Sequence, residues 1–193
     1  TMPTVPKEYG GGGLDVDHAV VLEEEVGLYD LTIPPFYDSG GRLGGASIVV
    51  WGSEEQKQSF LPPIFTGEVR TWQLLSEPEA GSDLANVKST AVRDGDDYII
   101  NGTKIWTSFA HHANMMFALV RTSNVGKVQQ GISFLLIDMT TPGITVKPII
   151  NLEGSHELNQ VFFDNVRVPR VNRVGEENHG WAVAKYLLQF ERF

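Results

Sequence analysis

The stretch of sequence that decides the fold is a loop at residues 75–83, which reads Leu75-Ser76-Glu77-Pro78-Glu79-Ala80-Gly81-Ser82-Asp83. It separates a part of the chain with helical periodicity from a part with the periodicity of strands. Small residues around Gly81 let backbone N–H groups approach a ligand, and a run of free N–H groups suits an anion or a carbonyl edge. By itself the stretch allows two interpretations, a binding loop or a plain connector.

The residues before this loop predict helices. Between Asp15 and Leu31 the apolar residues Ala19, Leu22, Val26 and Tyr29 recur at helical spacing, and 23–25 are glutamates mostly off that face. A break with glycine and proline follows at 33–41. The almost wholly apolar segment 43–51 then suits a second helix packed in a bundle.

A third helix is predicted by the pair Ser53 and Gln56, which have the spacing of a capping box. In that motif each side chain satisfies an exposed backbone amide of the other residue. Because proline removes a helical hydrogen bond, we expect this helix to weaken at Leu61, just before Pro62, and to stop by Gly67.

The residues after the loop predict strands. Seven short runs, most of them rich in β-branched and aromatic residues, lie at 87–93, 98–101, 103–107, 115–121, 132–138, 144–147 and 160–163. Turn signals separate them, and Asn101-Gly102 is specific for a type I′ hairpin turn because both of its central residues need positive φ. Seven short strands within about 100 residues predict an antiparallel barrel or sandwich.

The end of the chain predicts one more helix, in which Trp181, Ala184, Leu187 and Leu188 form an apolar face. No stop signal follows before Phe193, so we expect the helical region to continue beyond this chain. The expected fold class is α+β. It comprises a partial N-terminal helical bundle (1–68), an antiparallel β-barrel or sandwich middle domain (69–174) and the first helix of a missing helical domain (175–193).

Composition excludes several classes of protein. The 193 residues are 41% hydrophobic and 20% charged, as in an ordinary globular protein. There is no cysteine, hence no disulfide, thiolate nucleophile or cysteine-based metal site. The net charge of −9 argues against a protein that coats nucleic acid. The apolar run Met115–Val120 is too short to span a bilayer, and residues 1–9 lack the apolar region of a signal peptide. We therefore expect a soluble interior compartment.

A second candidate stretch is Asn101–Ser108. Its Trp106 has two interpretations, a core residue or a platform for a ligand, and the hydroxyls of Thr107 and Ser108 add polar groups that a core strand does not need. The other candidate residues give weaker evidence for a functional site. His111 and His112 are adjacent rather than at a metal-ligating spacing, so we expect no metal site. Ser82 lacks the context of a nucleophile elbow, and the glycine clusters match no dinucleotide fingerprint. Glu77 precedes a proline and is interpreted as structural.

Five stretches resemble the acyl-CoA dehydrogenase family in order and spacing, and they are Pro6–Gly11, Ser76–Asp83, Asn101–Ser108, Asn165–Pro169 and Gly180-Trp181. The likeness covers essentially the whole chain. It implies FAD as cofactor, an acyl-CoA thioester as substrate and an electron-transfer flavoprotein as electron acceptor. It also implies a homo-oligomer, dimer or tetramer, when intact. The implied location is the cytoplasm of a bacterium, or else the mitochondrial matrix.

The resemblance also implies site residues. The flavin-facing residues would be Gln73, Leu75, Ser76, Gly81, Ser82, Trp106, Thr107 and Ser108, and Ser82 would also lie beside the acyl-CoA. Leu75 and Ser76 would contact the isoalloxazine ring, Trp106 would pack on it, and Ser108 would hydrogen-bond near N5. Serine replaces the threonine of many relatives at 76 and 108, which keeps the hydroxyl, and Glu79 replaces a common glycine.

The implied reaction is α,β-dehydrogenation, in which a glutamate takes the α-proton and the β-hydrogen leaves as hydride to the flavin. The thioester oxygen is held by a flavin hydroxyl and by the backbone N–H of that glutamate. In the family this glutamate lies in the C-terminal helical domain, so we expect no catalytic residue in this chain. Two other classes stay open, a non-catalytic subunit that binds flavin or acyl-CoA, and a flavoenzyme like the acyl-CoA oxidases.

Overall fold

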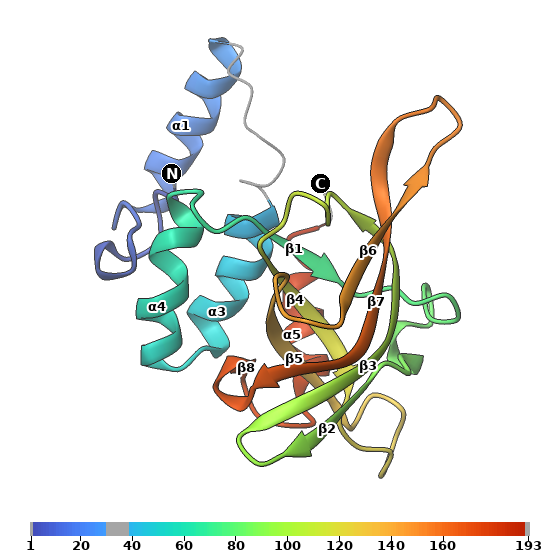
Figure 1. Ribbon diagram of the computed structural model, residues 1–193. Helices are drawn as coiled ribbons and strands as arrows, with labels where there is room; N and C mark the ends of the chain where they lie inside the picture. Colours follow the sequence, from blue (N-terminus) through green and yellow to red (C-terminus); the bar gives the residue numbers. More distant parts are fainter. Residues whose placement is uncertain (1, 30–38, 192–193) are drawn as a thin grey trace.

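Helices precede a curled β-sheet, and one helix follows it (Figure 1). The computed structural model describes residues 2–29 and 39–191. The helices are η1 (Lys7–Tyr9), α1 (Val16–Leu28), η2 (Ser39–Gly45), α3 (Ala46–Trp51), α4 (Glu54–Phe65), η3 (Leu84–Asn86), η4 (Arg170–Asn172) and α5 (Gly180–Leu187). The strands are β1 (Thr71–Leu74), β2 (Thr90–Asp94), β3 (Asp97–Ser108), β4 (Met115–Arg121), β5 (Ile132–Asp138), β6 (Ile144–Ile150), β7 (His156–Pro169) and β8 (Arg173–Val174). The expected helix end at Leu31, most of the break at 33–41 and the chain end at Phe193 lie outside the described residues.

The first predicted helix is present as α1, and it begins where Asp15 accepts a hydrogen bond from the N–H of His18 at 3.2 Å. Its apolar face is not covered, however. None of its residues is buried among the described residues, and Leu28 and Tyr29 are 77% and 72% exposed. In Figure 1 this helix projects away from α3, α4 and the sheet.

The predicted capping box of α4 is confirmed. The Ser53 hydroxyl accepts from the N–H of Gln56 at 3.2 Å, and the N–H of Ser53 donates to Gln56 Oε1 at 3.0 Å. The amide of Gln56 also reaches across the molecule, since its Nε2 donates to the carbonyls of Val171 at 2.6 Å and Arg173 at 2.8 Å. One side chain thus caps the helix and ties it to the segment that follows β7.

The predicted stop of this helix by Gly67 is confirmed, although the helix shows no break at Leu61. The helix α4 continues through Pro62 and Pro63 and ends at Phe65, before Gly67. Leu61, Ile64 and Phe65 are buried in the core between the helices and the sheet. Burial of these side chains holds the last turn helical despite the missing backbone donors.

The sheet has the order β6-β7-β3-β2-β4-β5-β8, with β1 paired to β4. Most neighbours are antiparallel, but β1 runs parallel to β4, and β2 meets β4 in parallel at the pair of Thr90 and Arg121. The predicted α+β fold with an antiparallel middle domain is confirmed, and its sheet is mixed but mostly antiparallel. The strand β1 was not predicted, because an alternation over only four residues is a weak signal and its partner β4 comes more than 40 residues later in the chain.

The predicted hairpin at Asn101-Gly102 is wrong. Both residues lie inside the single long strand β3, at a bulge opposite β7. The Asn101 side chain accepts from the N–H of Asn165 at 2.9 Å, and Asn165 has a φ of 51°. A Cβ on Gly102 would lie 2.6 Å from Ser89 Cα. Glycine is thus required here by close backbone approach rather than by a turn, and the hairpin turn of β2 and β3 falls at Gly95-Asp96.

Strands β4 and β5 have the predicted bounds because both of their faces are buried. Phe117, Leu119 and Phe134 pack in a core shared with the helices, and Met116 and Leu135 pack in a second core. The second core takes side chains from strands β1 to β5 and β7, so the sheet curls around it. A strand that is buried on both faces has a continuous run of apolar residues, and such a run can be recognised in the sequence.

We predict that Gly102→Ala destabilises the fold by about 1–3 kcal/mol more than Gly154→Ala, because the new methyl group must displace the Ser89 backbone. Gly154 is the matched control, since it also has positive φ but no atom within 4 Å of an added Cβ. Urea unfolding of both variants measures the difference. Equal losses would mean that β3 and β2 approach each other less closely at this point.

Candidate functional site

A cleft of about 330 Å³ lies where the loop after β1, the bulged end of β3 and helix α5 meet. Its walls are formed by Gln73, Leu75, Ser76, Gly81, Ser82, Leu84, Ile105, Trp106, Trp181, Leu188 and Glu191. Six of the eight residues predicted to face a flavin are among them. The other two, Thr107 and Ser108, are not part of the wall.

Trp106 stands out in this cleft. Its side chain is 58% exposed, which excludes the core interpretation. It lies at a second bulge of β3, between Lys104 and Thr107, and its φ is 60°. A bulky residue in the left-handed region costs about 1–2 kcal/mol and persists where the surroundings impose it. The bulge turns an indole out of the ladder and into the cleft.

Thr107 and Ser108 belong to the ladder with β7, where they pair with Asn159 and Leu158. The Thr107 carbonyl accepts from Asn159 Nδ2 at 3.0 Å. Its buried Oγ1, and likewise Gln73 Oε1 at the cleft wall, find no hydrogen-bond partner among residues 2–29 and 39–191. An unpaired buried polar atom costs about 1–3 kcal/mol, so the Gln73 oxygen favours a polar ligand at the wall.

The cleft loop folds back on itself before it reaches Gly81. The backbones of Glu77 and Ala80 exchange two hydrogen bonds, each of 3.0 Å, around Pro78-Glu79. The Ser76 carbonyl accepts from the N–H of Ile105 at 3.0 Å, which joins the loop to β3. A Cβ on Gly81 would meet no atom within 4 Å, so packing within the chain does not require glycine there.

A buried ion pair holds this loop. Lys104 is completely buried, and its ammonium donates to Glu77 Oε1 at 2.8 Å, to the Leu75 carbonyl at 3.1 Å and to the Leu119 carbonyl at 2.6 Å. The Glu77 carboxylate also accepts from the N–H groups of Lys88 at 2.6 Å and Ser89 at 3.0 Å. The structural interpretation of Glu77 fits these contacts, and they explain why β2 begins at Thr90 rather than at Val87.

Electrostatics favour the ionised pair. Burial acts to raise the pKa of the Glu77 carboxyl, but the charge and hydrogen bonds of Lys104, with those of Lys88 and Ser89, hold that pKa below its usual value. Burial lowers the pKa of the Lys104 ammonium, and Glu77 opposes that shift. Since each ammonium proton has an acceptor, both groups remain charged.

Sequence reasoning did not assign Trp181, Leu188 and Glu191 to the site. Trp181 and Leu188 were predicted to lie on the apolar face of α5. Both pack against the buried core, as predicted, and both also line the cleft. The Glu191 carboxylate accepts a hydrogen bond from Gln73 Nε2. The burial of Lys104 could have been predicted from the sequence, because period-two alternation places it on the same face of the strand as the buried Ile100.

The other polar candidates form a separate cluster. His111 stacks on His156 with ring centroids 3.9 Å apart, and the ring centroids of His111 and His112 are 4.0 Å apart. Within the described ranges, no group of three or more His, Asp or Glu side chains could hold a metal ion. Over the same residues, no helix has the length and apolar character needed to cross a membrane.

Comparison with known families shows to which family the chain belongs. The family model "Acyl-CoA dehydrogenase, N-terminal domain" matches residues 1–68, and "Acyl-CoA dehydrogenase, middle domain" matches residues 73–166. The chain belongs to the acyl-CoA dehydrogenase family. It is 40% identical over 187 residues to the acyl-CoA dehydrogenase IpdE1 of Mycobacterium tuberculosis, a match covering 97% of this chain and 48% of that relative. The chain thus spans about half the length of this curated relative.

Solved acyl-CoA dehydrogenase structures share the fold. The structure of the Tcur3481-Tcur3483 steroid ACAD G363A variant matches with a TM-score of 0.88 and 35% identity, over 98% of this chain and 49% of that one. The ChsE4-ChsE5 complex of Mycobacterium tuberculosis matches with a TM-score of 0.84 and 37% identity, over 97% and 48%. At these identities the helices, the mixed sheet and the final helix are those of the family.

Acyl-CoA dehydrogenases bind FAD, and the cleft suits one part of such a ligand. Two indoles, those of Trp106 and Trp181, offer flat apolar surfaces, and the unpaired Gln73 Oε1 offers an acceptor for a ring N–H. The volume of about 330 Å³ is at the lower end for a cofactor site, so a cleft of this size could enclose only a portion of FAD.

We predict that Glu77→Gln lowers the free energy of unfolding by about 3–5 kcal/mol at neutral pH, since it leaves the buried Lys104 ammonium without its counter-charge. The folded pKa of Glu77 is depressed, so its contribution is present above its ordinary pKa of 4.5 and is lost as pH falls through the folded pKa. The gap between wild type and variant should therefore narrow in acid.

Chemical denaturation at neutral and acidic pH measures this gap. Glu79→Gln is the control two residues away, because Glu79 pairs with Lys88 in solvent and should matter little. A gap for Glu77→Gln that stays constant with pH would contradict an ionised pair.

Proposed function

We propose that the intact protein is an FAD-dependent dehydrogenase of acyl-CoA thioesters, and that this chain supplies one side of its flavin site. The proposal assigns residues 1–68 to a partial helical domain, 69–174 to the flavin-facing middle domain and 175–193 to the start of a second helical domain. The observation that carries it is the cleft, where six residues selected by family resemblance come together, one of them the exposed Trp106 with its positive φ.

In this proposal the residues of the cleft bind and orient. Leu75, Ser76 and Gln73 contact the edge of the isoalloxazine ring, Trp106 packs against it, and Gly81 and Ser82 face the phosphate arm and the acyl-CoA. Thr107 and Ser108 complete the flavin-facing strand from its ladder positions. When bound, FAD supplies the acceptor for the β-hydrogen. Once a ligand is bound, Trp106 and Trp181 would shield it from water, which would strengthen its electrostatic contacts.

The catalytic base is proposed to lie in sequence outside this chain. Glu77 is unsuited to the role, because its two oxygens already accept from Lys104, Lys88 and Ser89. Glu191 contributes a carboxylate to the cleft wall, but that group is held by Gln73. The second donor to the thioester oxygen would be the backbone N–H of the base itself.

The partners proposed are an acyl-CoA substrate, an electron-transfer flavoprotein as acceptor and further subunits in an oligomer. ChsE4 and ChsE5, which share this fold, form a complex with each other, and this supports assembly with like chains. Bacterial relatives such as IpdE1 support a location in the bacterial cytoplasm.

We predict that the 193-residue chain with added FAD turns over acyl-CoA at least about 10⁴-fold more slowly than a version extended through the C-terminal helices. Loss of a general base removes about 10²–10⁴-fold in rate, and loss of one oxyanion donor about 10²–10³-fold. The assay uses saturated acyl-CoA thioesters of several lengths, a steroid thioester and an artificial electron acceptor.

Comparable turnover by the short chain would place a base within it, and Glu77→Gln and Glu191→Gln would then identify which carboxylate acts. Rapid reoxidation of the reduced, extended protein by oxygen would instead favour an oxidase. An extended protein that binds FAD but never turns over would favour the non-catalytic subunit.

We predict that Gly81→Val weakens FAD binding to the extended protein about tenfold or more with little change in stability. A Cβ at this position meets no atom within 4 Å, so we expect the loss of affinity to come from the ligand side of the loop. His112→Ala is the control, because His112 lies in the turn after β3 and does not line the cleft. Fluorescence titration measures the FAD affinity of both variants. Equal affinities would show that the loop is not part of the FAD site.

A further inference from the structure

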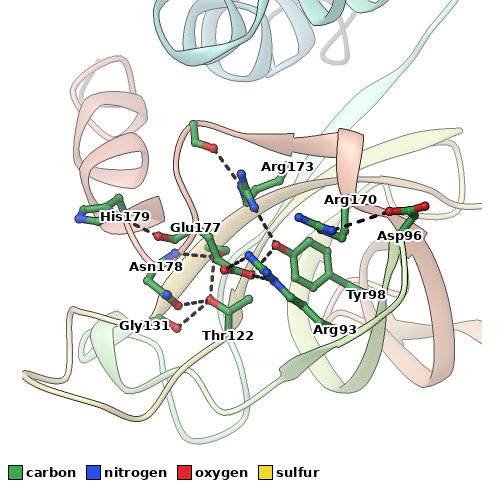
Figure 2. Close-up of polar contacts among 12 residues, drawn as sticks. Arg93, Asp96, Tyr98, Thr122, Gly131, Arg170, Arg173, Glu177, Asn178 and His179 are labelled. Carbon is green, nitrogen blue, oxygen red and sulfur yellow. Dashed lines mark hydrogen bonds and ion pairs between the residues drawn. The ribbon is translucent and has the colours of Figure 1, made fainter.

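The turn that leads into α5 is fixed by polar contacts that neither the cleft nor the proposed chemistry uses (Figure 2). Glu177 accepts hydrogen bonds from Arg93 Nε at 2.8 Å and from the Tyr98 hydroxyl at 2.7 Å, and Arg93 Nη2 pairs with its second oxygen. These donors come from β2 and β3, 84 and 79 residues earlier in the chain. Figure 2 shows the Glu177 carboxylate between the Arg93 and Tyr98 side chains.

The same contacts extend back along the chain. Arg173 Nη1 donates to the Tyr98 hydroxyl at 3.0 Å, and Arg173 Nε donates to the Gly175 carbonyl at 3.1 Å. Tyr98 itself is completely buried. The hydrogen bonds from Arg93 are the main cause that lowers the pKa of the Glu177 carboxyl, and the hydrogen bond from Tyr98 lowers it further. Burial of the carboxyl acts in the opposite direction. An ionised carboxylate thus ties the turn from 173 to 177 to the hairpin end of β2 and β3.

Asn178 is held by a second, closed set of hydrogen bonds. Its N–H donates to Ser133 Oγ at 2.9 Å, and its Oδ1 accepts from the Thr122 hydroxyl at 2.7 Å. Thr122 Oγ1 and Ser133 Oγ are 2.7 Å apart, so the Ser133 hydroxyl completes the ring by donating to Thr122. Asn178 has a φ of 68°, a conformation that asparagine tolerates better than most residues.

The helix begins immediately after this anchor. A Cβ on Gly180 would lie 2.6 Å from the backbone of Ser133 and Phe134, so the first turn of α5 presses on β5. Val183 and Leu187 then enter the core, and Trp181 and Leu188 form the cleft wall. With Glu177, Asn178 and Gly180 fixed before it, Trp181 has little freedom to shift.

We propose that Glu177 and Asn178 are positioning residues for the flavin cleft, which hold Trp181 in place opposite the loop after β1. The inference rests on the proposed function. Glu177 does not line the cleft, so it acts on the ligand only through α5. Through its carboxylate, the hairpin end of β2 and β3 fixes the cleft wall that comes from later in the chain.

The test compares Glu177→Gln with Glu176→Gln in the full-length protein. Glu176 is the matched control, because its side chain is 86% exposed and its carboxylate lies 3.7 Å from His179 Nδ1 rather than against the sheet. Glu177→Gln should raise the Kd for FAD about tenfold and change the flavin absorbance envelope, and Glu176→Gln should do neither. A variant that lowers the melting temperature but leaves the Kd and the spectrum unchanged would show a merely structural role.

A double-mutant cycle tests the route through Trp181. If Glu177 acts by placing that indole, Glu177→Gln should add no further loss of FAD affinity in a Trp181→Ala background. Additive losses would overturn the proposal.

A ligand-free readout separates this inference from the proposed function. Hydrogen exchange of the amides of 180–188 should rise several-fold in Glu177→Gln, with β4 and β5 unchanged. A wild type that binds no FAD would refute the proposed function, and exchange would still report on the anchor. Unchanged exchange in 180–188 would refute the anchor whatever the wild type binds.

Discussion

The buried ammonium of Lys104 is the contact on which the rest of this structure depends. A lysine in the interior of a sheet is unfavourable unless every proton has an acceptor, and here a carboxylate and two carbonyls satisfy all three. Those acceptors belong to the cleft loop and to β4, so satisfying one charge fixes the loop against two strands. The Glu77 carboxylate in turn accepts hydrogen bonds from the N–H groups of Lys88 and Ser89. Since these two N–H groups are already bonded, β2 does not extend back to them, and the chain there is available to form the cleft.

The cleft has two walls of different origin. The first comes from the loop after β1 and the bulge of β3, both fixed by Lys104 and the Ser76–Ile105 hydrogen bond. The second comes from α5, later in the chain, and is fixed by the contacts of Glu177 and Asn178 with the sheet. Each wall contributes one tryptophan. The two walls thus have separate anchors in the sheet, and the hydrogen bond from Gln73 to Glu191 joins them.

Local features were predicted well because their causes are local. The capping box of Ser53 and Gln56 needs only two residues of one turn, and the bounds of β4 and β5 follow from runs that are apolar on both faces. Predictions failed where distant residues decide. Asn101-Gly102 has the local chemistry of a hairpin, but Ser89 and Asn165 hold it inside a strand. The helix α4 passes through two prolines because Leu61 and Phe65 are buried against the sheet.

For the site, the sequence by itself determined the class of protein and most of the residues on one wall. Motifs such as Ser76–Asp83 are contiguous, and contiguous residues stay together in any fold that preserves them. Only the tertiary structure decided that Trp106 is turned outward at a bulge, that Lys104 and Glu77 form a buried pair, and that Trp181 completes the cleft. These depend on charges and hydrogen bonds between segments 27 to 84 residues apart, and no local pattern in a single sequence records such pairings.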